Sequence, residues 1–197
     1  MFSFTARLHE AIDTAARAHE DQARKDRDRH IPYVAHVFGV ACLLAEFGFD
    51  EDIVIAGLLH DVLEDRPSFA VEVEQFGARV AGLVRVVTER KRDEAGNERP
   101  WAVRKEEYIE RLRMAPPEAK AVSCADKIHN MQSILLALDR GGTIWHELKA
   151  SPEKQVDRMW RLRAALAEGW QHPILGRFDA VLGQLERRVR PSEMESS

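Results

Sequence analysis

Four side chains able to bind a metal or move a proton interrupt an apolar helical pattern in the stretch Gly57-Leu58-Leu59-His60-Asp61-Val62-Leu63-Glu64-Asp65. An α-helix turns about 100° per residue, so Glu64 lies one turn beyond His60 and Asp61. Asp65 in turn lies one turn beyond Asp61. Three carboxylates along one edge of a helix repel one another unless a cation or a solvent-filled pocket receives them.

Two interpretations of this polar edge stand on equal terms when the stretch is taken alone. In one, an amphipathic helix turns its acidic edge to water, and His60 is an ordinary surface or core histidine. In the other, the imidazole and the carboxylates belong to a metal site. The rest of the chain decides between them.

The composition is that of a soluble globular protein. The chain has 197 residues, 45% hydrophobic and 31% charged, which suits one domain with or without a helical extension. A net charge of −4 offers no basic field for nucleic acid, so we expect no nucleic-acid partner. No apolar run approaches a membrane span and the first residues lack the pattern of a secretion signal, so we expect no membrane partner and a cytoplasmic location. The oligomeric state stays open, with a homodimer among the options.

Apolar spacing predicts an all-α fold, and no strand pattern, internal repeat or glycine-rich phosphate loop is present. Two strongly charged loops, 22–32 and 89–99, either carry binding groups or are solvated surface, and the basic cluster of the second loop could meet phosphates. Proline and glycine positions and helical periodicity place helices at 5–21, 33–47, 51–65, 69–75, 77–88, 100–114, 117–138, from 152 onward, and 173–189.

Cysteine and tryptophan carry no predicted chemistry in this chain. Cys42 and Cys124 each lie in an apolar helical stretch, which favours buried thiols in a reducing compartment over a disulfide or a metal pair. The tryptophans at 101, 145, 160 and 170 are expected to be packing residues.

Two further positions carry polar groups into expected core. His36 lies in the first turn of the helix 33–47, which is apolar nearly all round, and its alternative is a hydrogen-bonded core imidazole. Asp126 follows the small apolar run 121–125, so its carboxylate begins in the core. An unpaired buried carboxylate costs on the order of several kcal/mol, so a cation is expected nearby, with a salt bridge to an arginine as the alternative.

These groups come from three expected helices that could converge. Together they offer two imidazoles and two carboxylates, from His36, the pair His60-Asp61, and Asp126. A mixed nitrogen and oxygen set of this kind suits Mn²⁺, Fe²⁺ or Zn²⁺.

The order His, then His-Asp, then a distant Asp resembles the signature of HD-domain phosphohydrolases. The likeness extends over about residues 5–140 to the hydrolase domain of RelA/SpoT alarmone enzymes, and the chain is closest to stand-alone small alarmone hydrolases because it is too short to hold a synthetase domain. The resemblance implies an HD-type helical bundle over 1–145, extra C-terminal helices over 146–190 packed on the same domain, and a disordered tail, 191–197. The motifs that carry it are Ala18-His19, Ala23-Arg24-Lys25, Pro32-Tyr33 with His36, the stretch 57–65, Phe76-Gly77, Val87-Thr88, and Ala125-Asp126-Lys127 with His129-Asn130-Met131.

The resemblance also implies roles for individual residues. A manganese ion, with Fe²⁺ or Zn²⁺ as alternatives, would be bound by His36, His60, Asp61 and Asp126. Glu64 and Asp65 match the acidic pair that orients and deprotonates the attacking water. Of the substrate-binding positions, Arg24 and Lys25 would flank the base and phosphates, and Lys127 and Asn130 would address the ribose or phosphates. Thr88 and Tyr108 would lie at the pocket wall, and Tyr33 is a further substrate-binding position.

The implied reaction is hydrolysis of the 3′-diphosphate of ppGpp or pppGpp to GDP or GTP and pyrophosphate. The chain departs from the family at Val37, where proline is usual, and at 27–31, where a glycine-containing loop is usual. Two alternatives remain open. One is an HD phosphohydrolase acting on an adenosine alarmone, another 3′-phosphorylated nucleotide or a nucleoside monophosphate, and the other is a catalytically silent nucleotide-binding regulatory module.

Overall fold

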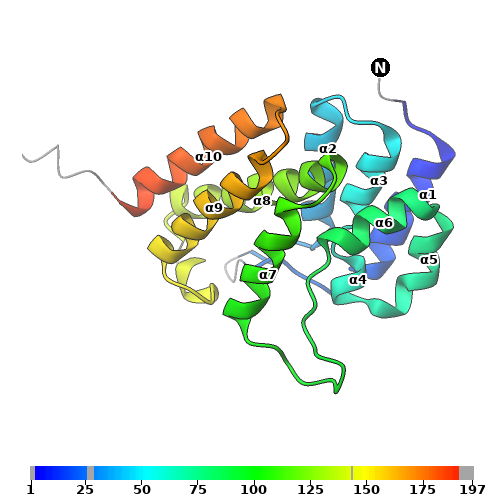
Figure 1. Ribbon diagram of the computed structural model, residues 1–197, viewed down its shortest axis with the longest axis horizontal. Coiled ribbons are helices and arrows are strands. Elements are labelled where there is room, and N and C mark those ends of the chain that lie inside the picture. The colour runs from blue at the N-terminus through cyan, green and yellow to red at the C-terminus, as the bar shows by residue number, and fades with distance from the viewer. Residues whose placement is uncertain (1–2, 26–28, 143, 191–197) are drawn as a thin grey trace, which may run out of the picture.

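The expected all-α fold is confirmed by the computed structural model, which describes residues 3–25, 29–142 and 144–190 (Figure 1). Within these ranges the chain forms helices and two isolated β-bridges, Ala23–Pro32 and Arg92–Glu98, but no strand. The predicted disordered tail, 191–197, and part of the loop 22–32 lie outside the described residues.

The helices occupy positions in the sequence close to those expected from apolar spacing. They are α1 (Ala6–Ala18), α2 (Val34–Glu46), α3 (Glu51–Leu59), α4 (Val62–Asp65), α5 (Ala70–Gln75), α6 (Ala78–Val87), α7 (Trp101–Arg113), α8 (Pro117–Asp139), α9 (Pro152–Ala167) and α10 (Pro173–Val189). Two short 3₁₀ segments, η1 (Pro67–Phe69) and η2 (Ile144–Glu147), connect them.

The long helix α8 links the two halves of the molecule. It packs against α2, α3 and α6 on the N-terminal side and against α10 on the C-terminal side, while α9 packs on α7 and α10. The side chains that these helices bury form one hydrophobic cluster, so α9 and α10 share a core with the helices before them. None of the helices in the described part of the chain is both long enough and apolar enough to cross a membrane.

The expectation of one continuous helix over 51–65 is wrong, because the helix is interrupted at His60 and Asp61. The Nδ1–H of His60 donates to the carbonyl of Gly57 at 2.8 Å. In a regular α-helix that carbonyl accepts from the N–H of Asp61, and a side chain that competes for such a carbonyl loosens the turn. The chain re-enters a helix where the N–H of Asp65 donates to the carbonyl of Asp61 at 3.0 Å.

Cys42 and Trp160 are more exposed than the sequence led us to expect. Cys124 is buried, which raises the pKa of its thiol, but Cys42 is exposed. The helix α2 is apolar nearly all round, so its sequence did not show which face is turned outward. Of the tryptophans, Trp170 is buried, those at 101 and 145 are half-buried, and Trp160 is exposed.

Two helical glycines give opposite predictions for stability. A Cβ at Gly57 would lie 2.4 Å from Cδ1 of Leu44, which is fully buried between α2 and α3. We expect Gly57→Ala to lower the free energy of unfolding by about 1–3 kcal/mol, because the core must shift to admit the methyl group. A Cβ at Gly82 in α6 would meet nothing within 4 Å, so Gly82→Ala is expected to raise it by about 0.5–1 kcal/mol through helix propensity. Urea unfolding of both variants measures the difference, and equal stabilities would contradict this description of the packing of α2 on α3.

Candidate metal centre

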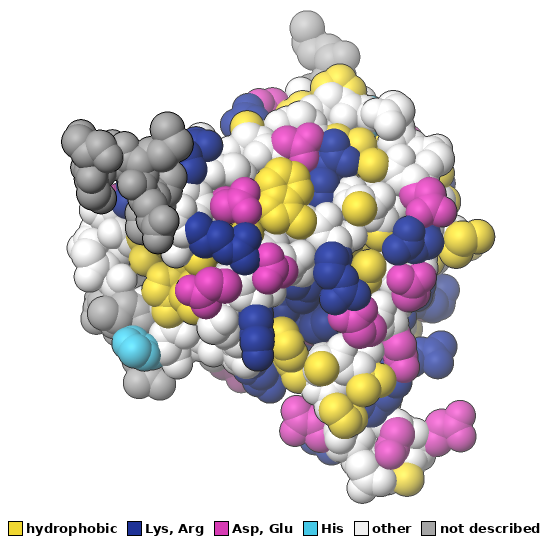
Figure 2. Space-filling model, turned by 60° about the vertical axis from the view of Figure 1, so that its left-hand side comes forward, with side chains coloured by type: hydrophobic (Ala, Val, Ile, Leu, Met, Phe, Trp, Pro, Cys, Tyr) yellow, Lys and Arg dark blue, Asp and Glu magenta, His cyan; other side chains and the backbone are white. Residues whose placement is uncertain are grey.

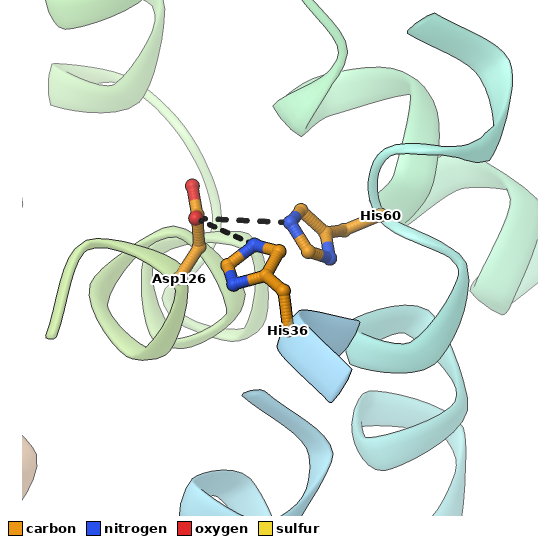
Figure 3. A group of neighbouring side chains, drawn as sticks. All are labelled: His36, His60 and Asp126. Atoms are coloured by element: carbon orange, nitrogen blue, oxygen red, sulfur yellow. Dashed lines mark ion pairs between the residues drawn. The ribbon is translucent and has the colours of Figure 1, made fainter. Parts of the chain in front are cut away.

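Three separate elements bring two imidazoles and two carboxylates to one buried point. His36 comes from the first turn of α2, His60 and Asp61 from the turn between α3 and α4, and Asp126 from α8. The Nε2 of His36 lies 3.3 Å from Oδ1 of Asp126 and 3.6 Å from Oδ2 of Asp61. The Nε2 of His60 lies 3.8 Å and 3.0 Å from the same two oxygens. Figure 3 shows both rings pointing toward Asp126.

These four groups fit a divalent cation. The Nε2 atoms of His36 and His60 are buried and have no hydrogen-bond partner among the described residues, which is costly for an imidazole nitrogen in the core. Ligand atoms held about 2.1–2.2 Å from a common ion are separated by roughly 3.0–3.6 Å at octahedral or tetrahedral angles. One atom from each of His36, His60 and Asp126 lies within 4.8 Å of the others, and Asp61 reaches both imidazoles. A cation among them would satisfy both unpartnered nitrogens at once.

The electrostatics of the centre also favour a cation. Burial opposes ionisation of Asp126, but Lys127 and the imidazoles of His36 and His60 hold the pKa of its carboxyl well below its usual range. Burial likewise lowers the pKa of His60, but the neighbouring carboxylate of Asp61 outweighs it and raises that pKa to about 9. The charge of His60 in turn lowers the pKa of Asp61 against the effect of burial, so both carboxylates are ionised at neutral pH. A metal bound at His60 must therefore displace a proton.

Hydrogen bonds outside the ligand set hold the ligands in place. The bond from His60 Nδ1 to Gly57 leaves Nε2 as the nitrogen that a metal would bind once its proton is displaced. The hydroxyl of Tyr33 donates to Oδ2 of Asp61 at 2.5 Å. Asp126 accepts from Lys127 Nζ at 2.5 Å and also from the side-chain amide of Asn130. The partner of the Asp126 carboxylate is thus a lysine and not the arginine considered from the sequence.

The remaining candidate ligand, His36, is held by His129. Its Nδ1 lies 2.9 Å from Nδ1 of His129, one turn beyond Asp126 on α8. If Nε2 of His36 binds a metal, its Nδ1 carries the proton, and this N–H donates a hydrogen bond to Nδ1 of His129. The His129 ring fits there only because residue 39 is glycine, since a Cβ at that position would lie 2.1 Å from Cδ2 of His129.

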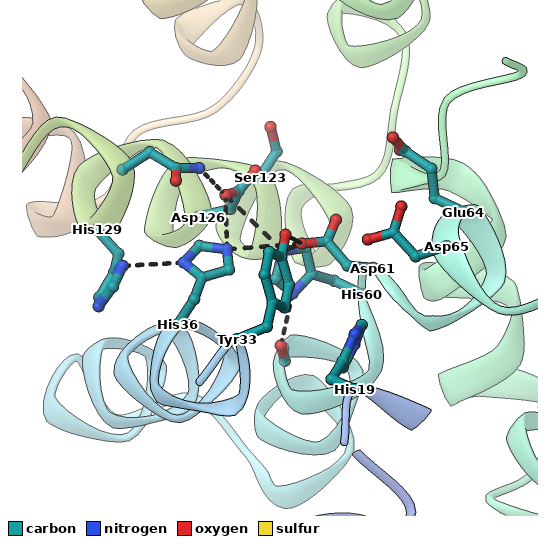
Figure 4. A network of polar contacts seen from close by, with 12 residues as sticks. His19, Tyr33, His36, His60, Asp61, Glu64, Asp65, Ser123, Asp126 and His129 are labelled. Carbon is teal, nitrogen blue, oxygen red and sulfur yellow. Dashed lines mark hydrogen bonds and ion pairs between the residues drawn. The ribbon is translucent and has the colours of Figure 1, made fainter. Parts of the chain in front are cut away.

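The acidic pair lies beside the centre, on α4. The ammonium group of Lys91 lies 3.1 Å from Oε1 of Glu64 and 2.6 Å from Oδ1 of Asp65. Gln22 donates to the other oxygen of Asp65 at 2.8 Å. Burial and the nearby Asp61 carboxylate raise the pKa of Glu64, and Lys91 opposes that rise. Figure 4 shows Glu64 and Asp65 on the same side of the centre as Asp61.

A cavity of about 760 Å³ opens over the ligands. It brings together most of the substrate-binding positions expected from the sequence, namely Arg24, Lys25, Tyr33, Tyr108, Lys127 and Asn130, with Glu64 and Asp65. The guanidinium of Arg24 lies 5.5 Å from the ring centroid of Tyr33 and donates to Asn130 at 2.8 Å. Thr88 is the exception, because it is not part of the cavity lining and its hydroxyl donates to the carbonyl of Val84 at 2.7 Å.

Sequence reasoning gave no site role to Lys91, His129 or Gln22. Lys91 belongs to the basic cluster of residues 89–99, for which phosphate contact and solvated surface were both open. His129 was part of the motif around Asp126 but was assigned no function. Its distance of three residues from Asp126, close to one helical turn, was the available signal for a second group at the centre.

The fold and the centre define a class of protein: a helical bundle with a buried His, His-Asp and Asp set. Residues 11–150 match the family model described as HD domain. The chain therefore belongs to the HD-domain family. This confirms the HD-type bundle expected from the sequence motifs.

Relatives of known name narrow the class. Over 137 residues the chain is 41% identical to human guanosine-3′,5′-bis(diphosphate) 3′-pyrophosphohydrolase MESH1, covering 68% of this chain and 73% of that protein. It is 36% identical to the Drosophila melanogaster protein of the same name over 181 residues, 82% of this chain and 97% of the other. A solved structure of a metazoan ortholog of SpoT, described as hydrolysing ppGpp, aligns with a TM-score of 0.78 at 28% identity over 93% of this chain and 98% of the other.

Gly39 gives a prediction about metal affinity. In Gly39→Ala the new methyl group must displace the ring of His129, so His36 loses the acceptor that orients it. We expect the affinity for divalent metal to fall about 10- to 100-fold, the usual effect of losing such an outer partner. Competition with a chromogenic chelator measures it, with Gly176→Ala in α10 as the control because a Cβ there meets nothing within 4 Å. Unchanged affinity in Gly39→Ala would show that His129 does not hold His36 in place.

Proposed function

We propose that this protein hydrolyses the 3′-diphosphate of ppGpp and pppGpp, releasing pyrophosphate and GDP or GTP. The observation that carries the proposal is the pair of buried, unpartnered imidazole nitrogens facing two ionised carboxylates, with Glu64 and Asp65 beside them. The proposed cofactor is Mn²⁺, with Fe²⁺ or Zn²⁺ as alternatives, because the ligand set mixes imidazole and carboxylate. The names of the human and fly relatives support the choice of substrate.

The acidic pair supplies the proton chemistry in this proposal. A divalent cation at the four ligands would supply Lewis-acid activation of the water and of the diphosphate. Glu64 and Asp65 orient the attacking water and take its proton. Glu64 is the better acceptor because burial and Asp61 raise its pKa toward the working pH, which is the usual requirement for a general base. Asp65, held by Lys91 and Gln22, keeps a fixed orientation.

The cavity side chains suit a nucleotide that carries phosphates. Arg24 presents a planar cation already held against Tyr33 and Asn130, so little conformational entropy is lost when it contacts a base or phosphate. Burial, together with Lys149 and Arg24, lowers the pKa of Lys25, so that its ammonium would gain from an anionic ligand. Lys127 and Asn130 address the ribose or phosphates, and Tyr33 and Tyr108 form the wall.

The decisive experiment follows a label placed in the 3′-diphosphate of ppGpp. We expect labelled pyrophosphate and unlabelled GDP, with loss of activity in EDTA and recovery on adding metal. Asp61→Ala should lose both metal and activity. Glu64→Gln should keep the metal but lose about 10²–10⁴-fold in kcat, because it removes the proton acceptor and no ligand.

Two outcomes would contradict the proposal. Faster turnover of an adenosine alarmone, another 3′-phosphorylated nucleotide or a nucleoside monophosphate would assign a different HD phosphohydrolase activity. Tight binding of ppGpp without any product would assign a regulatory module. Elemental analysis of the purified protein identifies the metal in either case.

The contact between Lys91 and Glu64 leads to a prediction about the pH dependence of kcat/KM. Its ammonium favours the ionised form of Glu64, so Lys91→Met raises the pKa of that carboxyl further. Because the base must be ionised to accept a proton, the acid limb of kcat/KM should move to higher pH. Arg92→Met is the control, since Arg92 is next in sequence and donates to the carbonyl of Gly96 in the exposed part of the loop. An acid limb that stays in place or moves to lower pH would remove Glu64 as the base.

A further inference from the structure

The cavity extends beyond the metal centre into a region that we call the α7–α9 basic lobe, defined by Arg104 and Lys105 of α7, Lys127 of α8, Arg158 of α9, and Glu89. Figure 2 shows the side of the molecule turned forward from the left of Figure 1, where Lys and Arg side chains lie set back in a hollow. Neither the metal ligands nor the acidic pair belong to this lobe.

The lobe holds more positive than negative charge. Glu89 pairs with Lys105 and lies 3.5 Å from Nη1 of Arg104. Lys127 is already engaged by Asp126 at 2.5 Å. In the described ranges no carboxylate forms an ion pair with Arg158, whose Nη2 donates to the side-chain carbonyl of Gln155. Among the described residues, Glu89 is therefore the one carboxylate paired with Arg104 and Lys105, and Arg158 has none.

Two buried guanidinium nitrogens have no hydrogen-bond acceptor in the part of the chain that the structure describes. Arg104 is 7% exposed, and its Nε has no hydrogen-bond partner. Nη1 of Arg158 is also buried without a partner, and the guanidinium lies 5.0 Å from the ring centroid of Trp101. A buried donor of a charged group costs free energy when it forms no hydrogen bond. An anionic acceptor bound in the lobe would remove this cost for both atoms.

The titration behaviour of the lobe agrees with its geometry. Burial and the charge of Lys127 lower the pKa of Lys105, although Glu89 opposes this. Burial also lowers the pKa of Arg158. Both cations would be stabilised by additional negative charge in the lobe.

We propose that the α7–α9 basic lobe binds the phosphate groups on the 5′ side of the substrate while the 3′-diphosphate lies at the metal centre. This inference rests on the proposed function. Guanidinium and ammonium groups match phosphate oxygens in geometry and charge, and a base offers no comparable negative charge. Lys127 connects the two regions, because it belongs to the lobe and its Nζ bonds to Asp126 at the centre.

The lobe also gives α9 a role. Arg158 lies beyond residue 150, where the match to the HD-domain model ends. The helical extension would therefore complete the substrate site, and α9 would select substrates by the phosphates that they carry at the 5′ position.

The test compares substrates that share a 3′-diphosphate and differ at the 5′ position: a 5′-hydroxyl compound, ppGpp and pppGpp. In Arg158→Gln we expect kcat/KM to fall about 10- to 100-fold for ppGpp and pppGpp, mainly through KM, and to stay unchanged for the 5′-hydroxyl compound. Arg161→Gln is the matched control, because Arg161 is exposed on the same helix and pairs with Glu106. Arg158→Lys should recover part of the loss. Equal loss on all three substrates would overturn the inference.

Binding measurements separate this inference from the proposed function. In the full-length protein, Arg158→Gln should weaken binding of GDP and leave binding of guanosine 3′-monophosphate unchanged. If no 3′-diphosphate is hydrolysed but GDP binding still depends on Arg158, the proposed function fails and the anion site stands. If GDP binds Arg158→Gln and the control equally well, the lobe is not a phosphate site. Thermal unfolding of each variant checks that the fold is intact.

Discussion

The need to satisfy four buried polar groups at one point dominates this structure. Two imidazole nitrogens without partners and two ionised carboxylates cannot remain together in a core at low cost unless a cation joins them. The relative positions of α2, α8 and the turn between α3 and α4 must therefore stay fixed. The surrounding hydrogen bonds fix the direction of each ligand before any cation arrives.

The same requirement explains two local features that would be weak points elsewhere. The helix is interrupted at His60 because its imidazole takes a backbone carbonyl, and this leaves Nε2 directed into the centre. A glycine at position 39 lowers the helix propensity of α2, but the absence of a side chain there leaves room for the ring of His129. Each feature lowers the local stability of a helix and at the same time orients a candidate metal ligand.

The sequence predicted the helices and the convergence of His36, His60, Asp61 and Asp126, because both depend on local pattern and on spacing. It did not predict the interruption at His60, since apolar periodicity does not register a side chain that competes for a carbonyl. Cys42 was misplaced because α2 has no polar face to mark its outer side. Lys91 and Arg158 could not be assigned, because their positions depend on how a loop and a C-terminal helix fold back over the cavity. No spacing rule connects them to Asp61 or Asp126.

The division of charge within the cavity follows from its two ends. The metal centre is acidic, so a phosphate approaches it only when a cation is bound there. The α7–α9 basic lobe attracts phosphate without such help, since the charge of Arg158 is offset only by the more distant carboxylate of Glu89. A substrate with phosphates at both ends can therefore be held at the lobe by charge and be positioned at the centre by the metal. A nucleotide with one phosphate group gains only one of these interactions, so the arrangement selects for doubly phosphorylated substrates through binding at the non-reacting end.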